Sequence, residues 1–144
     1  MEINDVIMSG LQLKKLMEKK IEPIIHEYDL RPVEVDLLVF LQEERNIDTA
    51  KGIIQKKHIS KAHISKSIDN LCSKGFIRIH EDDRDHRICH ISLTESSKEV
   101  IGKVTAVYTE CKDIMQRGIS PDEFEIVKKV INKMNENINQ ELGE

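Results

Sequence analysis

A segment in the middle of the chain combines a regular apolar spacing with small and polar side chains. Within residues 59–71, Ile64, Ile68 and Leu71 recur at the spacing of one face of a helix. Small and polar side chains suit close approach to base edges in a major groove. The segment therefore predicts a helix that docks inward through its apolar face and presents the opposite face to DNA. The residues on that opposite face are Ala62, Ser65, Lys66 and Asp69.

The residues that follow predict a small β-hairpin. Gly75 can end the helix in a left-handed conformation, because glycine lacks the Cβ that penalises it. Two short β-rich runs come next, residues 76–79 and 88–93, on either side of the charged tip at residues 82–87. A reading helix followed by a charged hairpin is the pattern of a winged helix-turn-helix.

The distribution of charge favours a polyanionic partner for this lobe, although the whole chain has a net charge of −4. Residues 51–87 contain nine Lys and Arg against five Asp and Glu, whereas the segments on either side are acidic. A local basic field attracts phosphates and releases counterions. A solvated lysine-rich helix face is the alternative interpretation of the same charges. The lysines concerned are Lys51, Lys56, Lys57, Lys61 and Lys66.

Length and composition indicate one domain of 144 residues without a membrane span. The segment at residues 1–5 lacks the basic and apolar regions of a signal peptide, so we expect a cytoplasmic protein. The three cysteines, Cys72, Cys89 and Cys111, are widely spaced without a CxxC pair. Reduced thiols, buried as packing residues, are therefore expected.

The order of the remaining helices can be predicted from apolar periodicity. A first helix is expected up to an interruption at Pro23 and residues 28–32, and a second begins near Pro32. A third short helix is expected to start at Asp48 as its cap, and a turn at residues 57–59 leads into the reading helix.

Two long helices are predicted after the hairpin, one capped by Thr94 and one by Ser120 followed by Pro121. Their apolar residues recur at spacings of three and four, which is typical of a seam that packs against a partner helix. We expect residues 1–30 and 94–144 to form a dimerisation region and residues 31–93 to form the winged lobe. A monomeric bundle, in which the seams pack on each other within one chain, is the alternative.

Residues 59–94 resemble the MarR family of transcriptional regulators. The resemblance is carried by residues 59–71, Lys74-Gly75-Phe76-Ile77-Arg78, Asp82-x-Arg84-Asp85-x-Arg87 and Ile91-x-Leu93-Thr94. It implies a mainly α fold with a small β-wing, in which terminal helices form a dimer base. Two features depart from the family pattern: Arg31 stands where a small hydroxyl residue usually caps the second helix, and Ser97 replaces a frequent glycine.

The resemblance, together with the chemistry of the side chains, predicts the DNA contacts. Ala62, His63 and Lys66 are expected to reach base edges, and Ser65 a base or a phosphate. Arg87 is expected to enter the minor groove, and Asp85 to hold the wing in shape by pairing with a nearby basic side chain. The remaining predicted DNA-binding residues are Lys57, Ser60, Lys61 and Arg84.

The resemblance also implies a small aromatic or phenolic effector bound between the dimer base and the winged lobe. No residue identifies the effector, and the candidates are His26, Tyr28, Arg31 and Tyr108. A thiol-responsive regulator is an alternative, but no cysteine lies near the start of the chain. A metal-responsive regulator is a second alternative, because soft ligands gather around the wing, but strand alternation separates Cys89 from His90. The candidate ligands are His80, His86, Cys89 and His90. We predict neither a metal nor a cofactor.

The sequence favours a regulator over an enzyme. It has no GxSxG, no phosphate-cradling glycine loop and no HExxH. A winged protein-interaction module without DNA affinity is a further alternative, because fold does not fix function. The prediction is a homodimeric, ligand-responsive repressor that binds a palindromic double-stranded operator, and whose two reading helices change their spacing when the effector binds.

Overall fold

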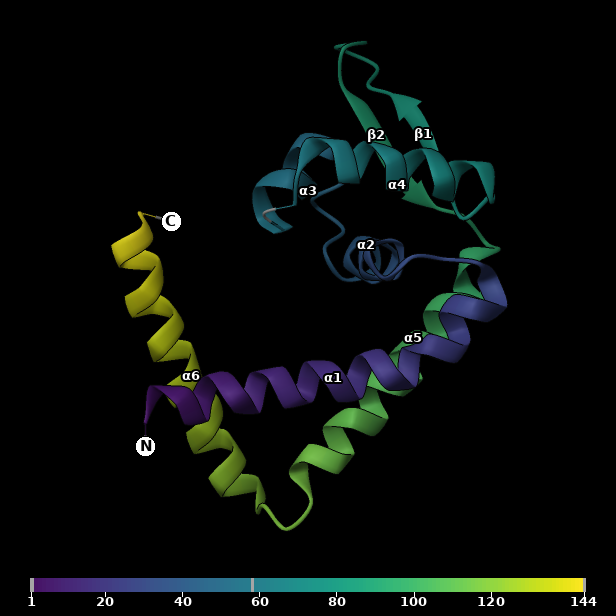
Figure 1. Cartoon of the computed structure of the whole chain (residues 1–144). Coiled ribbons are helices and arrows are strands. Elements are labelled where there is room, and N and C mark those ends of the chain that lie inside the picture. The colour runs from purple at the N-terminus through teal and green to yellow at the C-terminus, as the bar shows by residue number, and fades with distance from the viewer. Residues whose placement is uncertain (1, 58, 144) are drawn as a thin grey trace. The chain divides into compact units, whose positions relative to one another are not determined.

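A computed structural model describes residues 2–57 and 59–143 and divides the chain into two compact units, residues 1–108 and 109–144. The first unit contains five of the helices in whole or in part and a two-stranded hairpin (Figure 1). The elements are α1 (Ile3–Tyr28), α2 (Pro32–Glu43), α3 (Ala50–Lys57), α4 (Lys61–Ser73), β1 (Ile77–Glu81), β2 (Cys89–Leu93), α5 (Ser97–Gln116) and α6 (Pro121–Leu142).

Helix α1 continues through Pro23, so the predicted interruption at this residue is wrong. Proline removes one N–H from the helical ladder but has a φ angle that a helix accepts. Ile21 and Ile24, on either side of Pro23, are both buried, and their packing holds the helix together. The helix ends at Asp29, whose φ of 51° is left-handed, and the Leu30 N–H then bonds back to the Ile25 carbonyl at 3.0 Å.

Helix α2 starts at Pro32 as predicted and is the most deeply buried helix of the first unit. Proline suits the first helical position, because the N–H it lacks would have no partner there. The helix buries side chains on nearly every side rather than along one stripe. Its buried residues are Glu34, Val35, Leu37, Leu38, Val39, Phe40 and Leu41.

Helix α3 begins at Ala50 and not at Asp48. The Thr49 hydroxyl accepts the Gly52 N–H at 3.1 Å and does the capping that was predicted for Asp48. The Asp48 side chain is instead engaged by His90. His58, in the predicted turn before the reading helix, lies outside the described residues.

The reading helix α4 begins and ends two residues later than the predicted segment 59–71, and it confirms the predicted division into two faces. Ser60 is its cap, and the Ser60 hydroxyl accepts the His63 N–H at 3.3 Å. Ile64, Ile68 and Leu71 are buried, whereas the four residues predicted for the outer face are exposed. Gly75 follows the helix with a φ of +76°, the left-handed conformation expected for it.

The wing is an antiparallel hairpin of β1 and β2, with Ile77 opposite Leu93 and Glu81 opposite Cys89. Each strand differs by one or two residues from the predicted runs, which is within the usual uncertainty of element boundaries. The inner side of the hairpin buries Ile77 and Ile91, which join the core formed with α2 and α4.

Helices α5 and α6 are present, but Thr94 does not cap α5. Its hydroxyl donates to the Gly75 carbonyl at 2.5 Å, and its own carbonyl accepts from the Ser97 hydroxyl at 2.7 Å. Ser120 caps α6 as predicted, in a reciprocal capping box with Glu123.

The two predicted seams differ in burial. In α5, Val100, Val104 and Cys111 are buried, whereas no residue of α6 is buried. The expectation that all three thiols are buried holds only for Cys111, because Cys89 is exposed at the start of β2 and Cys72 is partly buried. Within residues 2–57 and 59–143, no helix has both the length and the hydropathy needed to cross a bilayer.

Candidate nucleic-acid interface

The exposed face of α4 presents the predicted base-reading residues together. Ala62, His63, Ser65 and Lys66 are exposed, and all belong to the N-terminal half of the helix. Ser60 is also exposed, although its hydroxyl oxygen already accepts the His63 N–H. The hydroxyl hydrogen remains free to donate to an anion. The structure therefore places these side chains on one accessible surface.

Lysines surround this surface. Lys51, Lys56, Lys57, Lys61 and Lys66 are exposed on α3 and α4, two helices that pack against each other. Lys57 also lies over the ring of Phe40, with its Nζ atom 5.6 Å from the ring centre. This contact positions the stem of Lys57 at the end of α3 while the side chain remains accessible.

A buried carboxylate fixes the other side of α4. Glu34 of α2 is 0% exposed, and its Oε1 atom accepts from Asn70 Nδ2 of α4 at 2.8 Å and from Arg31 Nε at 2.9 Å. Its Oε2 atom accepts the backbone N–H of Arg31 at 3.0 Å. Burial alone would raise the pKa of Glu34, but these hydrogen bonds outweigh burial and lower the pKa.

Arg31 extends this arrangement to a second residue of the reading helix. Its Nη2 atom donates to the hydroxyl of Ser67, which is 0% exposed, at 3.2 Å. The Ser67 hydroxyl in turn donates to the His63 carbonyl at 2.8 Å. Arg31, the residue that departs from the family pattern, thus connects the cap of α2 to α4. We call Arg31, Glu34, Ser67 and Asn70 the α2–α4 clamp.

The sequence analysis did not predict this clamp. Glu34 occupies the third position of a helix that starts at Pro32, where a glutamate typically closes a capping box. The capping box could therefore have been predicted from the sequence. The hydrogen bond between Glu34 and Asn70 could not, because it joins residues far apart in the chain.

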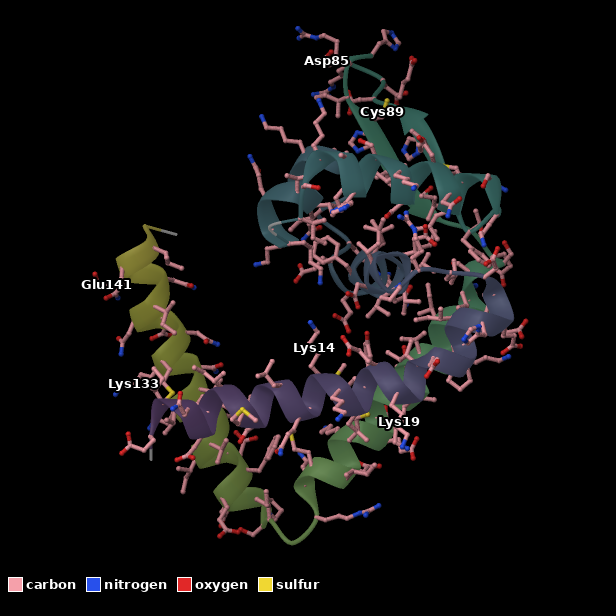
Figure 2. All side chains as sticks on the ribbon, viewed as in Figure 1. Lys14, Lys19, Asp85, Cys89, Lys133 and Glu141 are labelled. Atoms are coloured by element: carbon pink, nitrogen blue, oxygen red, sulfur yellow. The ribbon has the colours of Figure 1, made fainter. Side chains whose placement is uncertain are left out.

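The wing tip confirms the predicted role of Asp85 as an internal partner. Its two carboxylate oxygens accept from Arg87 Nε and Nη2, both at 3.0 Å. This two-point pairing lowers the pKa of Asp85 and raises that of Arg87. The Arg87 side chain nevertheless remains 90% exposed, so its other N–H groups face solvent. Figure 2 shows Asp85 at the tip of the hairpin.

A second ion-pair cluster joins the wing to the rest of the lobe. His90 of β2 contacts Asp48 through Nδ1 at 2.9 Å and Asp82 through Nε2 at 2.8 Å. The contact with His90 is the main reason that the pKa of Asp82 falls to about 2. The sequence analysis considered His90 only as a metal ligand. Among the described residues, no group of three or more His, Cys, Asp or Glu is arranged to hold a metal ion.

The predicted effector residues separate into two sets. His26 and Tyr108 line a cleft of about 640 Å³ between α1, α2 and α5, together with apolar residues such as Leu13 and Met17. Tyr28 does not line it, because its hydroxyl donates to Glu99 at 2.8 Å and its ring packs edge-on against Phe76. Arg31 is held in the α2–α4 clamp.

The cleft has a mixed lining that the sequence did not predict. Lys14 is a cation in it, but Glu18, Glu22 and Asp36 are acidic. Burial raises the pKa of Asp36, and the nearby Lys57 and Lys14 oppose this shift. Acidic groups repel an anionic ligand, so the lining favours a neutral ligand over an anionic one.

Comparison with known proteins supports the class of protein indicated by this geometry. Residues 28–88 match the model of the MarR family. A crystal structure of MarR is 19% identical with a TM-score of 0.74, and the match covers 99% of this chain and 95% of that chain.

Two further solved structures contain DNA. The MepR–DNA complex of S. aureus is 21% identical with a TM-score of 0.76, and the match covers 95% of this chain and 98% of that chain. A MarR-family regulator from Listeria monocytogenes, complexed with 26mer DNA, is 18% identical with a TM-score of 0.78. That match covers 98% of this chain and 91% of the other.

The reading helix, the hairpin and these likenesses define a winged helix-turn-helix protein. Residues 28–88, which span α2 to the wing tip, are similar to the MarR family, in agreement with the sequence resemblance.

We expect Glu34→Gln to lower the free energy of unfolding by about 1–3 kcal/mol at pH 7, because it removes the charged acceptor of a buried network. The difference in the free energy of unfolding between wild type and variant should become smaller at acid pH. A carboxylate whose pKa is lowered in the folded state stabilises it above the unfolded pKa, and this stabilisation disappears as pH falls through the folded pKa. Urea unfolding at several pH values measures both effects.

Glu43→Gln is the matched control, because Glu43 is exposed at the end of the same helix. We expect it to change the free energy of unfolding by less than about 0.5 kcal/mol. Equal effects of the two substitutions would contradict the importance of the clamp.

Proposed function

We propose that this protein is a sequence-specific regulator that binds double-stranded DNA through α4 and the wing. The observation that carries the proposal is the exposed N-terminal half of α4, bordered by exposed lysines of α3 and α4. The DNA contained in the MepR and Listeria monocytogenes structures supports it by analogy. In this proposal, α4 enters a major groove and the wing reaches an adjacent minor groove.

The proposed contacts fall into three groups. Ala62, His63 and Lys66 meet base edges, and Ser65 meets a base or a phosphate. Arg87 enters the minor groove, where the negative potential is strongest when the groove is narrow, while Asp85 maintains its position. The residues proposed to contact phosphates are Lys57, Ser60, Lys61 and Arg84.

We propose a homodimer that binds a palindromic site. Helix α6 carries a row of exposed apolar side chains, and large exposed apolar surfaces mark interaction sites. A second copy would cover this row and present a second α4 about one turn of DNA away, roughly 34 Å. The exposed apolar residues of α6 are Ile126, Val127, Val130, Ile131, Met134, Ile138 and Leu142.

In this proposal, residues 1–30 and 94–144 form the dimerisation region and residues 31–93 form the winged DNA-binding lobe. A dimer that occupies a promoter blocks polymerase without further machinery, so we propose a repressor that acts in the cytoplasm, where its DNA partner would be.

The cleft between α1, α2 and α5 is the proposed effector site. Its apolar lining, with Tyr108 and His26 at its border, suits a small aromatic or phenolic molecule. A ligand there would contact Pro32 and Val35 of α2, the helix whose Glu34 holds α4. Binding would therefore change the orientation of α4 and lower the affinity for DNA.

We expect Lys66→Ala and Arg87→Ala each to weaken DNA binding by about 1–3 kcal/mol, because each removes a cation from a proposed contact. Selection from a library of random duplexes identifies a bound sequence, and fluorescence anisotropy at several salt concentrations measures the affinity. Arg87→Ala should matter most on sites with a narrow minor groove. Affinity should fall steeply with added salt.

Lys133→Ala is the matched control, because it removes the same charge from an exposed position on α6 (Figure 2). We expect it to leave DNA affinity unchanged within a factor of about two. If wild-type affinity persisted in both the Lys66 and the Arg87 variant, the assigned interface would be wrong. If the protein bound another protein independently of salt and had no affinity for duplex DNA, the alternative of a winged protein-interaction module would be favoured.

We expect the wild-type protein to sediment as a dimer at micromolar concentration. Ile131→Glu should shift it toward monomer, because it places a charge in the middle of the exposed apolar row. Lys133→Glu, two residues away on the same helix, should leave the dimer intact. Sedimentation equilibrium measures the molecular mass of the wild-type protein and of each variant. The dimer would be overturned if the wild-type protein were still monomeric at 10 times this micromolar concentration.

We expect phenol, a neutral probe, to raise the melting temperature more than 4-hydroxybenzoate, because three acidic residues line the cleft. Met17→Trp should abolish the shift by filling the cleft, provided that circular dichroism shows a wild-type fold. Thermal unfolding with millimolar probe measures the effect. The absence of a shift with either probe would contradict an aromatic effector at this site.

A further inference from the structure

His90 bridges two carboxylates that belong to different parts of the winged lobe. Its Nδ1 atom lies 2.9 and 3.0 Å from the two oxygens of Asp48, in the loop before α3. Its Nε2 atom lies 2.8 Å from Asp82, which follows β1 at the entrance to the wing tip. The side chain is 24% exposed, so water reaches it only in part. The hairpin that it joins to the lobe stands beside α4 in Figure 1.

This arrangement fits a cationic imidazole. A neutral histidine has one ring N–H donor and one ring nitrogen that can only accept, whereas carboxylates accept and do not donate. With neutral His90, one of the two contacts would therefore bring a lone pair against a carboxylate. Protonated His90 donates to both Asp48 and Asp82, and both contacts become charge-assisted.

The bridge continues to the wing tip through hydrogen bonds. The Asp82 Oδ1 atom accepts the backbone N–H groups of Arg84 at 2.9 Å and Asp85 at 3.0 Å. Asp85 then holds the Arg87 guanidinium. An unbroken series of polar contacts thus runs from the start of α3 to the exposed arginine. Figure 2 labels Cys89, next to His90 in the chain, and Asp85, the residue that holds Arg87.

We propose that His90 is a positioning residue for the wing, and that its cationic form fixes the tip in the conformation that binds DNA. This inference rests on the proposed function. A wing held in one conformation loses less conformational entropy when DNA binds, so the protonated protein binds more tightly. The added positive charge also offsets the acidic residues of the tip. As His90 loses its proton, the tip loosens and the affinity for DNA falls.

The direction of the pH dependence follows from the groups that face His90. Asp82 and Asp48 raise the pKa of His90 above its ordinary value of 6.5, and partial burial opposes them. The contacts of cationic His90 with Asp48 and Asp82, which we call the His90 anchor, are complete below pH 6.5. They are lost as pH rises through the raised pKa of His90. His80 of β1 also faces His90, with ring centres 5.4 Å apart. His86 contacts Glu81 and not this cluster.

The first test uses the free protein and does not involve DNA. NMR titration of the histidine rings should give His90 a pKa above 6.5, and Asp82→Asn should shift it downward. The protection factors of the backbone amides of residues 84–87, which are exchange rates corrected for the intrinsic rate at each pH, should fall above the pKa of His90 in the wild-type protein. In His90→Gln these protection factors should be low at every pH. His80→Gln, the matched control on the neighbouring strand, should behave like the wild type.

The second test measures affinity for the selected duplex across the same pH range at constant ionic strength. We expect wild-type affinity to fall about fivefold or more as His90 deprotonates, a typical coupling between linked equilibria. The His90→Gln variant should lack this fall in affinity, and the His80→Gln variant should keep it. His63, on the reading helix, is present in all three proteins, so the difference between their pH profiles isolates His90.

Two results overturn the proposal. One is a His90 pKa at or below 6.5 with protection factors of the wing amides that do not change with pH. The other is a His90→Gln variant that keeps the wild-type pH profile of DNA affinity. A different result, wild-type NMR behaviour as expected but no duplex binding at any pH, would reject the proposed DNA function and leave the His90 anchor standing as a feature of the wing.

Discussion

The winged lobe depends on the hydrogen bonds that are made to the buried carboxylate of Glu34. A charge removed from water is stable only when its hydrogen-bonding capacity is satisfied. Here the partners come from the cap of α2 and from α4, so the requirement to satisfy Glu34 also orients the reading helix. The apolar contacts of Ile64 and Leu71 hold α4 in the core but are not directional. The hydrogen bonds to Asn70 and Ser67 select one rotation of the helix.

The sequence predicted the parts of this fold that depend on local periodicity. The presence of a helix at α4, its two faces, the left-handed Gly75 and the Ser120 cap all follow from spacing and from the conformational preferences of single residues. The pairing of Asp85 with a basic side chain was also accessible, because its partner Arg87 lies two residues away.

Interactions between distant residues were not accessible in the same way. Pro23 stays within α1 because the surrounding isoleucines pack into the core, and local propensity does not contain that contact. The replacement of Asp48 by Thr49 as the cap of α3 has the same origin, since Asp48 is engaged by a histidine 42 residues later. The α2–α4 clamp likewise joins residues 36 positions apart. The predicted DNA contacts remain predictions.

The α2 helix lies between two features that would otherwise be independent. Pro32, Val35 and Asp36 line the cleft, while Glu34, in the same turn, contacts α4. Close-packed interiors transmit strain rather than absorb it locally, and α2 is buried on nearly every side. In the proposed mechanism, a displacement that begins at the cleft would therefore reach Asn70.

The side-chain hydrogen bonds that the structure describes between α4 and other helices all arise in its C-terminal half or just beyond it. Ser67 and Asn70 contact α2, and Lys74 donates to the carbonyl of Tyr28 at 3.2 Å. The N-terminal half is held instead by the non-directional packing of buried Ile64 and of α3. A helix of this length spans about 20 Å, so a tilt of about 6° at the fixed end would displace the other end by about 2 Å. Such leverage magnifies a small motion where base edges would be read.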